Sequence, residues 1–334
     1  MKKISKHLPI LVLGLFLAAA LCFLAFGSNQ VFKLTTPVLY LDKGEKEAIP
    51  LQTLLPGTPT YVSQDPAIAT VSKDGIVKGK KTGITQIKVG LQGIKESLEV
   101  RVNYGSYLRS QLPPSPYRSD YPNLTDEQYA NFRAVTTTGI KEGVLYRSST
   151  PISSSIGRCT QADAACEKAG IRTIINLCNK KKSLKDYKGY SKTYYSKQTI
   201  LAQKLDPDFF STQFQNGLVK ALRFMISHKG PYLVHCTYGR DRTGFLIAIL
   251  ECLMGASSEE VLHDYMITYE NYNGLTPEDQ MYKDLATHLM EHDLKKAFEI
   301  DDIRKADLAK EAKSYLQNLG LTKKEISSLK KQLR

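Results

Sequence analysis

The pattern of apolar and polar residues divides the chain into parts of different character. Residues 8–26 form an uncharged, apolar run that follows three lysines. Such a run is long enough to cross the hydrocarbon core of a membrane, and the lysines before it predict that the residues after it lie outside the cytoplasm. We therefore expect a signal anchor, a transmembrane helix, over residues 1–30. A cleaved signal peptide is the alternative, because Ala25 and Gly27 are small residues at the spacing that a signal peptidase recognises.

Between residues 36 and 104 the apolar residues come in short stretches that alternate with polar ones. Pro, Gly and Asp separate these stretches, as at the Asp74-Gly75 turn. Alternation with a period of two is typical of strands with one buried face, so this part is predicted to form a small all-β sandwich. The expected strands are Val38–Leu41, Ala48–Leu51, Ile68–Val71, Gly75–Lys78, Thr85–Val89 and Ser97–Val102.

Residues 105–120 are expected to form a linker, stiffened by three prolines. From residue 121 to residue 334, short strand-like runs alternate with longer helical patterns. This alternation predicts an α/β layer fold with a central, mostly parallel sheet. The expected elements include strands at Ile171–Cys178 and Tyr232–His235 and helices at Phe214–His228, Thr243–Met254, Asp302–Leu319 and Lys323–Leu333.

Composition adds few constraints. The formal net charge is +13, but the basic residues are spread along the chain and no nucleic-acid motif is present, so no nucleic acid is predicted as a partner. None of the six cysteines has metal-ligand spacing. Cys159 and Cys166 are expected to be unpaired, with a disulfide as the alternative if this domain lies outside the cytoplasm. Cys178 and Cys252 lie in apolar runs and are expected in the core.

The strongest chemical signal is Val234–Gly244, with the sequence V-H-C-T-Y-G-R-D-R-T-G, between the predicted strand and the helix that follows it. A loop that leads into a helix N-terminus directs backbone N–H groups at one point and makes an anion site. Cys236 would lie there as a thiolate, because the same field stabilises its negative charge. Arg242 adds a planar fork that matches two phosphate oxygens, and Gly239 allows a tight loop.

At these residues the chain resembles the cysteine-dependent protein tyrosine phosphatase superfamily. The form H-C-T-Y-G-R-D-R-T-G is most similar to a bacterial branch whose members act on phosphotyrosine and often on phosphoinositides, and which usually has Lys where this chain has Arg240. The resemblance implies that Cys236 attacks phosphorus, that Arg242 holds the phosphoryl oxygens, and that Thr243 helps to release the thiolate. The expected substrate-binding residues are Thr237, Tyr238, Gly239, Arg240 and Thr243.

Two other parts of the chain carry resemblances. The pieces N-F-R (Asn131–Arg133) and G-V-L-Y-R-S (Gly143–Ser148) recur near the start of the bacterial phosphatase branch, where Arg147 would brace the sheet near the loop. A surface arginine is the alternative for Arg147. Residues Asp65–Val89 resemble a group 2 bacterial immunoglobulin-like domain, which implies a spacer or adhesive module in an extracytoplasmic protein.

The leaving group of a phosphate ester needs a proton, and two sources compete. The bacterial branch carries an Asp inside the loop, at the position of Asp241, which we favour. Most of the superfamily instead uses an Asp on a mobile loop upstream, where this chain has Asp206 and Asp208; a turn with a helix cap is the alternative for these two. His235 is expected to orient the loop, with direct catalysis as the alternative.

The expected activity is hydrolysis of phosphate monoesters, phosphotyrosine first, through a cysteinyl-phosphate and without a metal or organic cofactor. The substrate would be a phosphorylated protein or an anionic phospholipid. One alternative is a phosphoinositide or inositol-phosphate phosphatase, for which Arg240 would supply a second cation. A non-catalytic adhesion or scaffold protein is less favoured, because Cys236 and Arg242 are both present. The catalytic domain is expected outside the cytoplasm, anchored to the membrane or secreted.

Overall fold

The computed structural model describes residues 32–334, which divide into two compact units. The first unit ends at Gln111 and the second begins at Leu112. This boundary falls inside residues 105–120, where a linker is expected, but much of that range is ordered: helix α3 covers Tyr104–Ser110.

The expected fold class is wrong in its first part, the transmembrane helix. Across residues 32–334, no helix is both long and apolar enough to cross a membrane. The apolar run at residues 8–26, on which that prediction rested, lies outside the described residues.

The first unit is an all-β structure with its own apolar core. Its strands form a four-stranded sheet in the order β2-β9-β8-β5, a three-stranded sheet β3-β7-β6 and the pair β1-β4. Burial alternates along the long β8–β9 hairpin, and Val77, Ile87 and Leu98 are fully buried between the sheets. The strands are β1 (Phe32–Leu34), β2 (Val38–Leu41), β3 (Lys46–Ala48), β4 (Leu51–Thr53), β5 (Thr60–Ser63), β6 (Ala69–Val71), β7 (Ile76–Gly79), β8 (Gly83–Leu91) and β9 (Ile94–Val102).

One predicted strand, Ala48–Leu51, is wrong. The chain leaves β3 at Ala48, re-enters a strand at Leu51, and the two strands pair with different partners, β7 and β1. Pro50 lies between them, and a proline has no N–H to give to a ladder, so it separates two short strands. The resemblance of residues 65–89 to an immunoglobulin-like domain stays a prediction.

The second unit is built on a five-stranded sheet in the order β10-β11-β14-β12-β13. Its central strand, β14 (Tyr232–His235), is buried at every residue and pairs in parallel with both neighbours. Only the two-residue β10 runs antiparallel. The other strands are β10 (Arg133–Ala134), β11 (Leu145–Ser148), β12 (Thr173–Asn176) and β13 (Thr199–Ala202).

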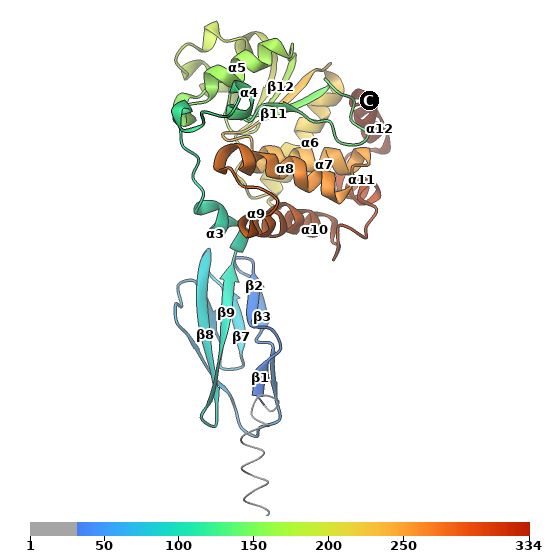
Figure 1. Cartoon of the computed structure of the whole chain (residues 1–334). Coiled ribbons are helices and arrows are strands. Elements are labelled where there is room, and N and C mark those ends of the chain that lie inside the picture. Colours follow the sequence, from blue (N-terminus) through green and yellow to red (C-terminus); the bar gives the residue numbers. More distant parts are fainter. Residues whose placement is uncertain (1–31) are drawn as a thin grey trace, which may run out of the picture. The chain divides into compact units, whose positions relative to one another are not determined.

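Helices cover both faces of this sheet (Figure 1). On one face α5 packs Ala162 and Cys166 against Ile174 and Leu233 of the strands. On the other face lies α7, which has 12 buried residues among its 14 because α8 and α11 also pack on it. The helices are α4 (Asp126–Tyr129), α5 (Cys159–Lys168), α6 (Thr212–Ser227), α7 (Asp241–Met254), α8 (Ser258–Asn273), α9 (Gln280–Leu285), α10 (His292–Phe298), α11 (Leu308–Asn318) and α12 (Lys323–Gln332).

The strand register brings the ends of three strands together. Ser148 of β11 and Asn176 of β12 both align with His235, the last residue of β14. Because these strands are parallel, the residues that follow them meet at one edge of the sheet. Cys236 is the first residue beyond that edge.

Candidate active site

Cys236 lies between the end of β14 and the start of α7 at Asp241, as the sequence predicts. Its side chain belongs to a residue only 2% exposed, so it forms the floor of the loop 236–242 rather than part of the surface. An anion that reaches the sulfur must therefore enter the loop and lose its water. The loop has to replace that water with donors of its own.

Three successive carbonyl groups of the loop are bonded to parts of the protein outside it. These bonds are Thr150 N to Thr237 O (3.0 Å), Tyr272 Oη to Tyr238 O (2.7 Å), Asn131 Nδ2 to Tyr238 O (3.2 Å), Asn131 Nδ2 to Gly239 O (3.3 Å) and Arg147 Nη2 to Gly239 O (2.9 Å). In a planar trans peptide the N–H points opposite to the carbonyl. The N–H groups of Tyr238, Gly239 and Arg240 consequently point away from these external partners and toward the interior of the loop.

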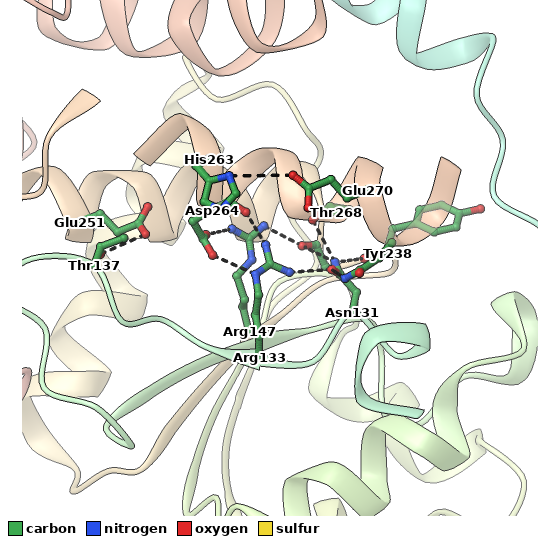
Figure 2. Close-up of polar contacts among 12 residues, drawn as sticks. Asn131, Arg133, Thr137, Arg147, Tyr238, Glu251, His263, Asp264, Thr268 and Glu270 are labelled. Carbon is green, nitrogen blue, oxygen red and sulfur yellow. Dashed lines mark hydrogen bonds and ion pairs between the residues drawn. The ribbon is translucent and has the colours of Figure 1, made fainter. Parts of the chain in front are cut away.

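The bonds from Asn131 and Arg147 belong to a buried polar network, drawn in Figure 2. Asp264 of α8 pairs with Arg147 of β11 and, at 2.9 Å, with Arg133 of β10. Arg133 also donates to the side chain of Asn131 (2.6 Å), and Thr268 of α8 accepts from Asn131 (3.1 Å). Two strands and one helix thus hold the same stretch of loop. Arg147 is fully buried, which excludes the surface role that the sequence left open.

The charges in this network are set by burial and by proximity. Burial alone would raise the pKa of Asp264, but Arg133 and Arg147 hold the pKa below its usual value, so Asp264 is ionised. Glu251 of α7 is also buried nearby; burial and the negative charge of Asp264 raise its pKa well above the usual value, which favours its neutral form. The charged groups of the network are then the guanidinium groups of Arg133 and Arg147 and the carboxylate of Asp264.

Arg242 is fixed at the first turn of α7 with one edge of its guanidinium already occupied. Its Nη1 donates to Leu205 O (2.9 Å) and to Leu177 O (3.4 Å), and its Nη2 donates to Thr237 Oγ1 (3.2 Å). A guanidinium has five N–H groups. The bonds above leave the Nε–H and one Nη2–H, which lie on one edge of the plane and form a two-pronged fork for an oxyanion.

His235 is placed under the loop and its tautomer is fixed. Asn176 Nδ2 donates to Tyr195 Oη (2.9 Å), Tyr195 Oη lies 3.1 Å from His235 Nε2, and His235 Nδ1 lies 3.2 Å from Cys236 O. The carbonyl needs a donor, so Nδ1 carries the proton and Nε2 accepts from the tyrosine. Burial lowers the pKa of His235 to about 4, so the imidazole is neutral at neutral pH. This arrangement orients the Cys236 carbonyl.

The structure places the two remaining loop side chains together. Arg240 Nε lies 3.3 Å from the Asp241 carboxylate, and its guanidinium lies over the rings of Tyr238 and Tyr269. Arg240 is only 7% exposed. The second cation expected in the loop is therefore engaged with a carboxylate and two aromatic rings.

The upstream aspartates lie on an exposed segment that touches the loop through its backbone. Asp206 follows Leu205, whose carbonyl binds Arg242, and both Asp206 and Asp208 are exposed. Asp208 O accepts from the hydroxyl of Ser211, so the turn given as the alternative for these aspartates is present, with Ser211 as the N-cap of α6. Thr243 is fully buried, and its hydroxyl has no hydrogen-bond partner within residues 32–334.

Several residues of the site carry no local signal in the sequence. Asp264, Thr268 and Tyr272 lie on α8 at spacings of four residues, which places them on one helical face, but only the fold shows that this face meets the loop. Tyr195 lies in a tyrosine-rich segment that resembles ordinary packing. Cys178, expected in the core, lies beside the site: burial and then the negative charge of Cys236 raise the pKa of Cys178 to about 12.

All five cysteines of the described part of the chain are free. Cys159 and Cys166 lie on the same helix, α5, about two turns apart. Two helical turns rise about 10 Å, which is too far for a disulfide.

A family model described as the tyrosine phosphatase family matches residues 125–334. Among solved structures, the core catalytic domain of the PP-IP phosphatase SIW14 from S. cerevisiae is 18% identical, covering 50% of this chain and 90% of that one, with a TM-score of 0.32. P. aeruginosa TpbA in complex with phosphotyrosine is 16% identical, covering 60% of this chain and 99% of that one, with a TM-score of 0.36. No curated protein matches the chain.

Proposed function

Because the chain belongs to the tyrosine phosphatase family and is a cysteine-dependent phosphatase, we propose that it hydrolyses phosphotyrosine in protein substrates. The observation that carries this proposal is the set of loop carbonyls bonded outward, since it turns three N–H groups toward the space above Cys236. Those groups and the Arg242 fork match the three equatorial oxygens of a phosphoryl group as charge redistributes over them.

The proposed reaction has two steps. In the first, Cys236 Sγ forms a bond to phosphorus, the ester P–O bond breaks, and the leaving oxygen takes a proton from a general acid. In the second, water attacks the cysteinyl-phosphate, the S–P bond breaks, and the same group, now a carboxylate, takes a proton from the water. Phosphate and the Cys236 thiolate are released.

We propose Asp241 as the general acid and keep Asp206 as the alternative. Asp241 belongs to the loop itself, next to the bound phosphate. Its carboxyl group lies 3.3 Å from Arg240 Nε, which holds it at this position in the loop. Asp206 lies beyond the loop, beside the carbonyl that holds Arg242.

The position of Arg240 favours a monophosphate ester over a multiply phosphorylated head group. Within the loop, a second phosphate would need a second available cation, but Arg240 is buried against Asp241, Tyr238 and Tyr269. Phosphoinositides and inositol phosphates are thus the second candidate substrates.

The chemistry is tested by Cys236→Ser, with Cys159→Ser as the matched control because Cys159 is also a free thiol but lies on α5. Cys236→Ser should abolish release of para-nitrophenol from its phosphate ester and still bind tungstate in calorimetry, because the loop N–H groups remain. Cys159→Ser should keep normal turnover. Activity of Cys236→Ser within about tenfold of the wild type would exclude the cysteine mechanism.

The acid is tested on phenyl phosphate, whose leaving group needs a proton more than nitrophenol does. Asp241→Asn should lower kcat on phenyl phosphate by roughly 10²–10⁴ and have a smaller effect on the nitrophenyl ester. Asp206→Asn should change both rates little. The reverse pattern would assign the acid to Asp206.

A further inference from the structure

A lysine-rich segment, residues 180–197, follows β12 beside the candidate active site. It contains seven lysines and a single acidic residue, Asp186. All seven lysines are exposed, and within residues 32–334 none of them forms a salt bridge, although Lys197 interacts electrostatically with Asp163. Such a concentration of positive charge repels itself and attracts anions. The seven are Lys180, Lys181, Lys182, Lys185, Lys188, Lys192 and Lys197.

Both ends of the lysine-rich segment are attached to the loop that holds Cys236. Before the segment, Leu177 N donates to His235 O (2.9 Å) and Leu177 O accepts from Arg242. Near its other end, the buried Tyr195 hydroxyl bonds to His235 Nε2. The segment therefore borders the site and cannot move away from it without breaking these contacts.

Tyrosines and one aspartate fix the segment against the domain. Tyr187 Oη accepts from Asn179 (2.6 Å), and the Asp163 carboxylate of α5 accepts from the N–H groups of Tyr194 (2.9 Å) and Tyr195 (2.8 Å). The backbone forms three short 3₁₀ turns between these anchors. With the tyrosines holding the backbone, the lysines remain on the solvent side.

Chain geometry places the first lysines close to the reacting centre. Cys178 lies close enough to Cys236 for the negative charge of Cys236 to raise the pKa of Cys178, and Lys180 is two residues farther along the chain. Consecutive Cα atoms are about 3.8 Å apart, so the Cα atoms of Lys180 and Lys182 lie within about 8 and 15 Å of that of Cys178. These upper limits keep the first lysines close to Cys178, which itself lies beside Cys236.

The type and spacing of the cations in the lysine-rich segment indicate which kind of anion it binds. It has seven lysines but no arginine, and a lysine is a flexible point charge without the fork that suits phosphate. Its charges are spread over 18 residues instead of converging on one point. Carboxylates distributed along a peptide fit this arrangement better than a compact polyphosphate does.

We propose that the lysine-rich segment recognises acidic residues that flank the phosphotyrosine of a protein substrate, an inference that rests on the proposed function.

The test compares two phosphotyrosine peptides that differ only in their flanking residues, Asp and Glu in one and Asn and Gln in the other. The test variant is Lys180→Gln/Lys181→Gln/Lys182→Gln/Lys185→Gln in the full chain. The matched control is Lys313→Gln/Lys323→Gln/Lys324→Gln/Lys331→Gln, four exposed lysines on α11 and α12. This control surface lies near the far end of α7, because Lys330 bonds to Leu253 O. Leu253 is 12 positions after Asp241, a rise of about 18 Å along the helix.

The wild type should hydrolyse the acidic peptide with a kcat/KM about tenfold above that of the neutral peptide, mainly through KM, and the preference should shrink at high salt. The test variant should lose this preference, whereas the control variant should keep it. For each protein, the kcat/KM on a peptide is divided by the kcat/KM of the same protein on para-nitrophenyl phosphate. This ratio removes differences between the variants in the folded fraction and in the rate of the chemical step.

Equal rates on the two peptides in the wild type, or equal loss of preference in both variants, would overturn the inference. If the wild type hydrolyses the nitrophenyl ester but neither peptide, the protein-substrate part of the proposed function fails instead. Preferential release of phosphate from inositol polyphosphates would assign the lysines to a different substrate class and would also overturn the inference.

Discussion

At the scale of single residues, His235 shows how burial changes what a side chain can do. Histidine next to a nucleophile suggests a base, but His235 is buried, neutral and fully engaged with Tyr195 and Cys236 O. Its function in this arrangement is to hold a carbonyl. The pKa of His235 is about 4 in the folded state, below the ordinary value of 6.5. Between these two pH values the unfolded chain binds a proton at His235 and the folded state does not.

This difference predicts a pH dependence of stability. The contribution of neutral His235 to the free energy of unfolding is fully present above pH 6.5 and is lost as the pH falls toward 4. At pH 4.5 the loss should be about 2–3 kcal/mol. His235→Gln should be less stable than the wild type at pH 7.5 and should lose less stability on acidification. Urea unfolding at both pH values measures this, and equal losses in the two proteins would contradict it.

Gly239 makes a second prediction at this scale. Its φ is +66°, and a Cβ there would overlap the Ser148 carbonyl oxygen of the neighbouring strand. Gly239→Ala should therefore displace the loop and lower kcat/KM by at least about 10²-fold, as misplaced groups do.

Gly274 is the control for this substitution. It has nearly the same φ, +64°, but a Cβ added to it would have no described atom within 4 Å. Gly274→Ala should cost only about 1 kcal/mol of conformational strain and leave the nitrophenyl phosphatase rate near normal. Similar rates for the two variants would show that the loop tolerates a side chain at residue 239.

At the scale of elements, α8 and the strands β10 and β11 act together on the loop. Asp264 of α8 connects them, since its carboxylate forms ion pairs with Arg133 of β10 and Arg147 of β11. Removing one partner of a buried ion pair is costly because the other charge stays in the interior.

Asp264→Asn should lower the free energy of unfolding by about 3–5 kcal/mol. In the fraction that stays folded, Arg147 is no longer fixed at Gly239 O, so tungstate should bind more weakly in calorimetry. Asp126→Asn is the control, because the Arg118–Asp126 pair is largely exposed and should contribute less than about 1 kcal/mol. Unchanged tungstate affinity in folded Asp264→Asn would show that the network does not position the loop.

At the scale of the whole molecule, each of the two units has an apolar core of its own. A fragment of residues 112–334 should therefore fold and hydrolyse para-nitrophenyl phosphate at the rate of the full chain. Steady-state kinetics and a thermal melt check this prediction. A fragment that folds but is inactive would show that the first unit contributes to the site. The location of the catalytic domain outside the cytoplasm stays a prediction.

Much of the site could be predicted from the sequence, because its central part is one continuous stretch. β14 and the start of α7 border the loop, so Cys236, Gly239 and Arg242 are brought together by local spacing alone. Helix starts are local as well: the capping boxes that begin α4, α8 and α12 at Thr125, Ser257 and Thr322 each join residues only three positions apart.

Only the tertiary structure decided which residues hold the loop from outside. Asn131 and Arg147 reach the Gly239 carbonyl, and Tyr272 reaches that of Tyr238, because parallel strand pairing and the packing of α8 bring these distant residues to the loop. Hydrophobic periodicity shows that a face is buried but not which partner covers it, so these contacts carry no local signal. For the same reason the sequence placed Cys178 in the core and offered Arg240 as an available cation, whereas packing put the first beside Cys236 and buried the second against Asp241.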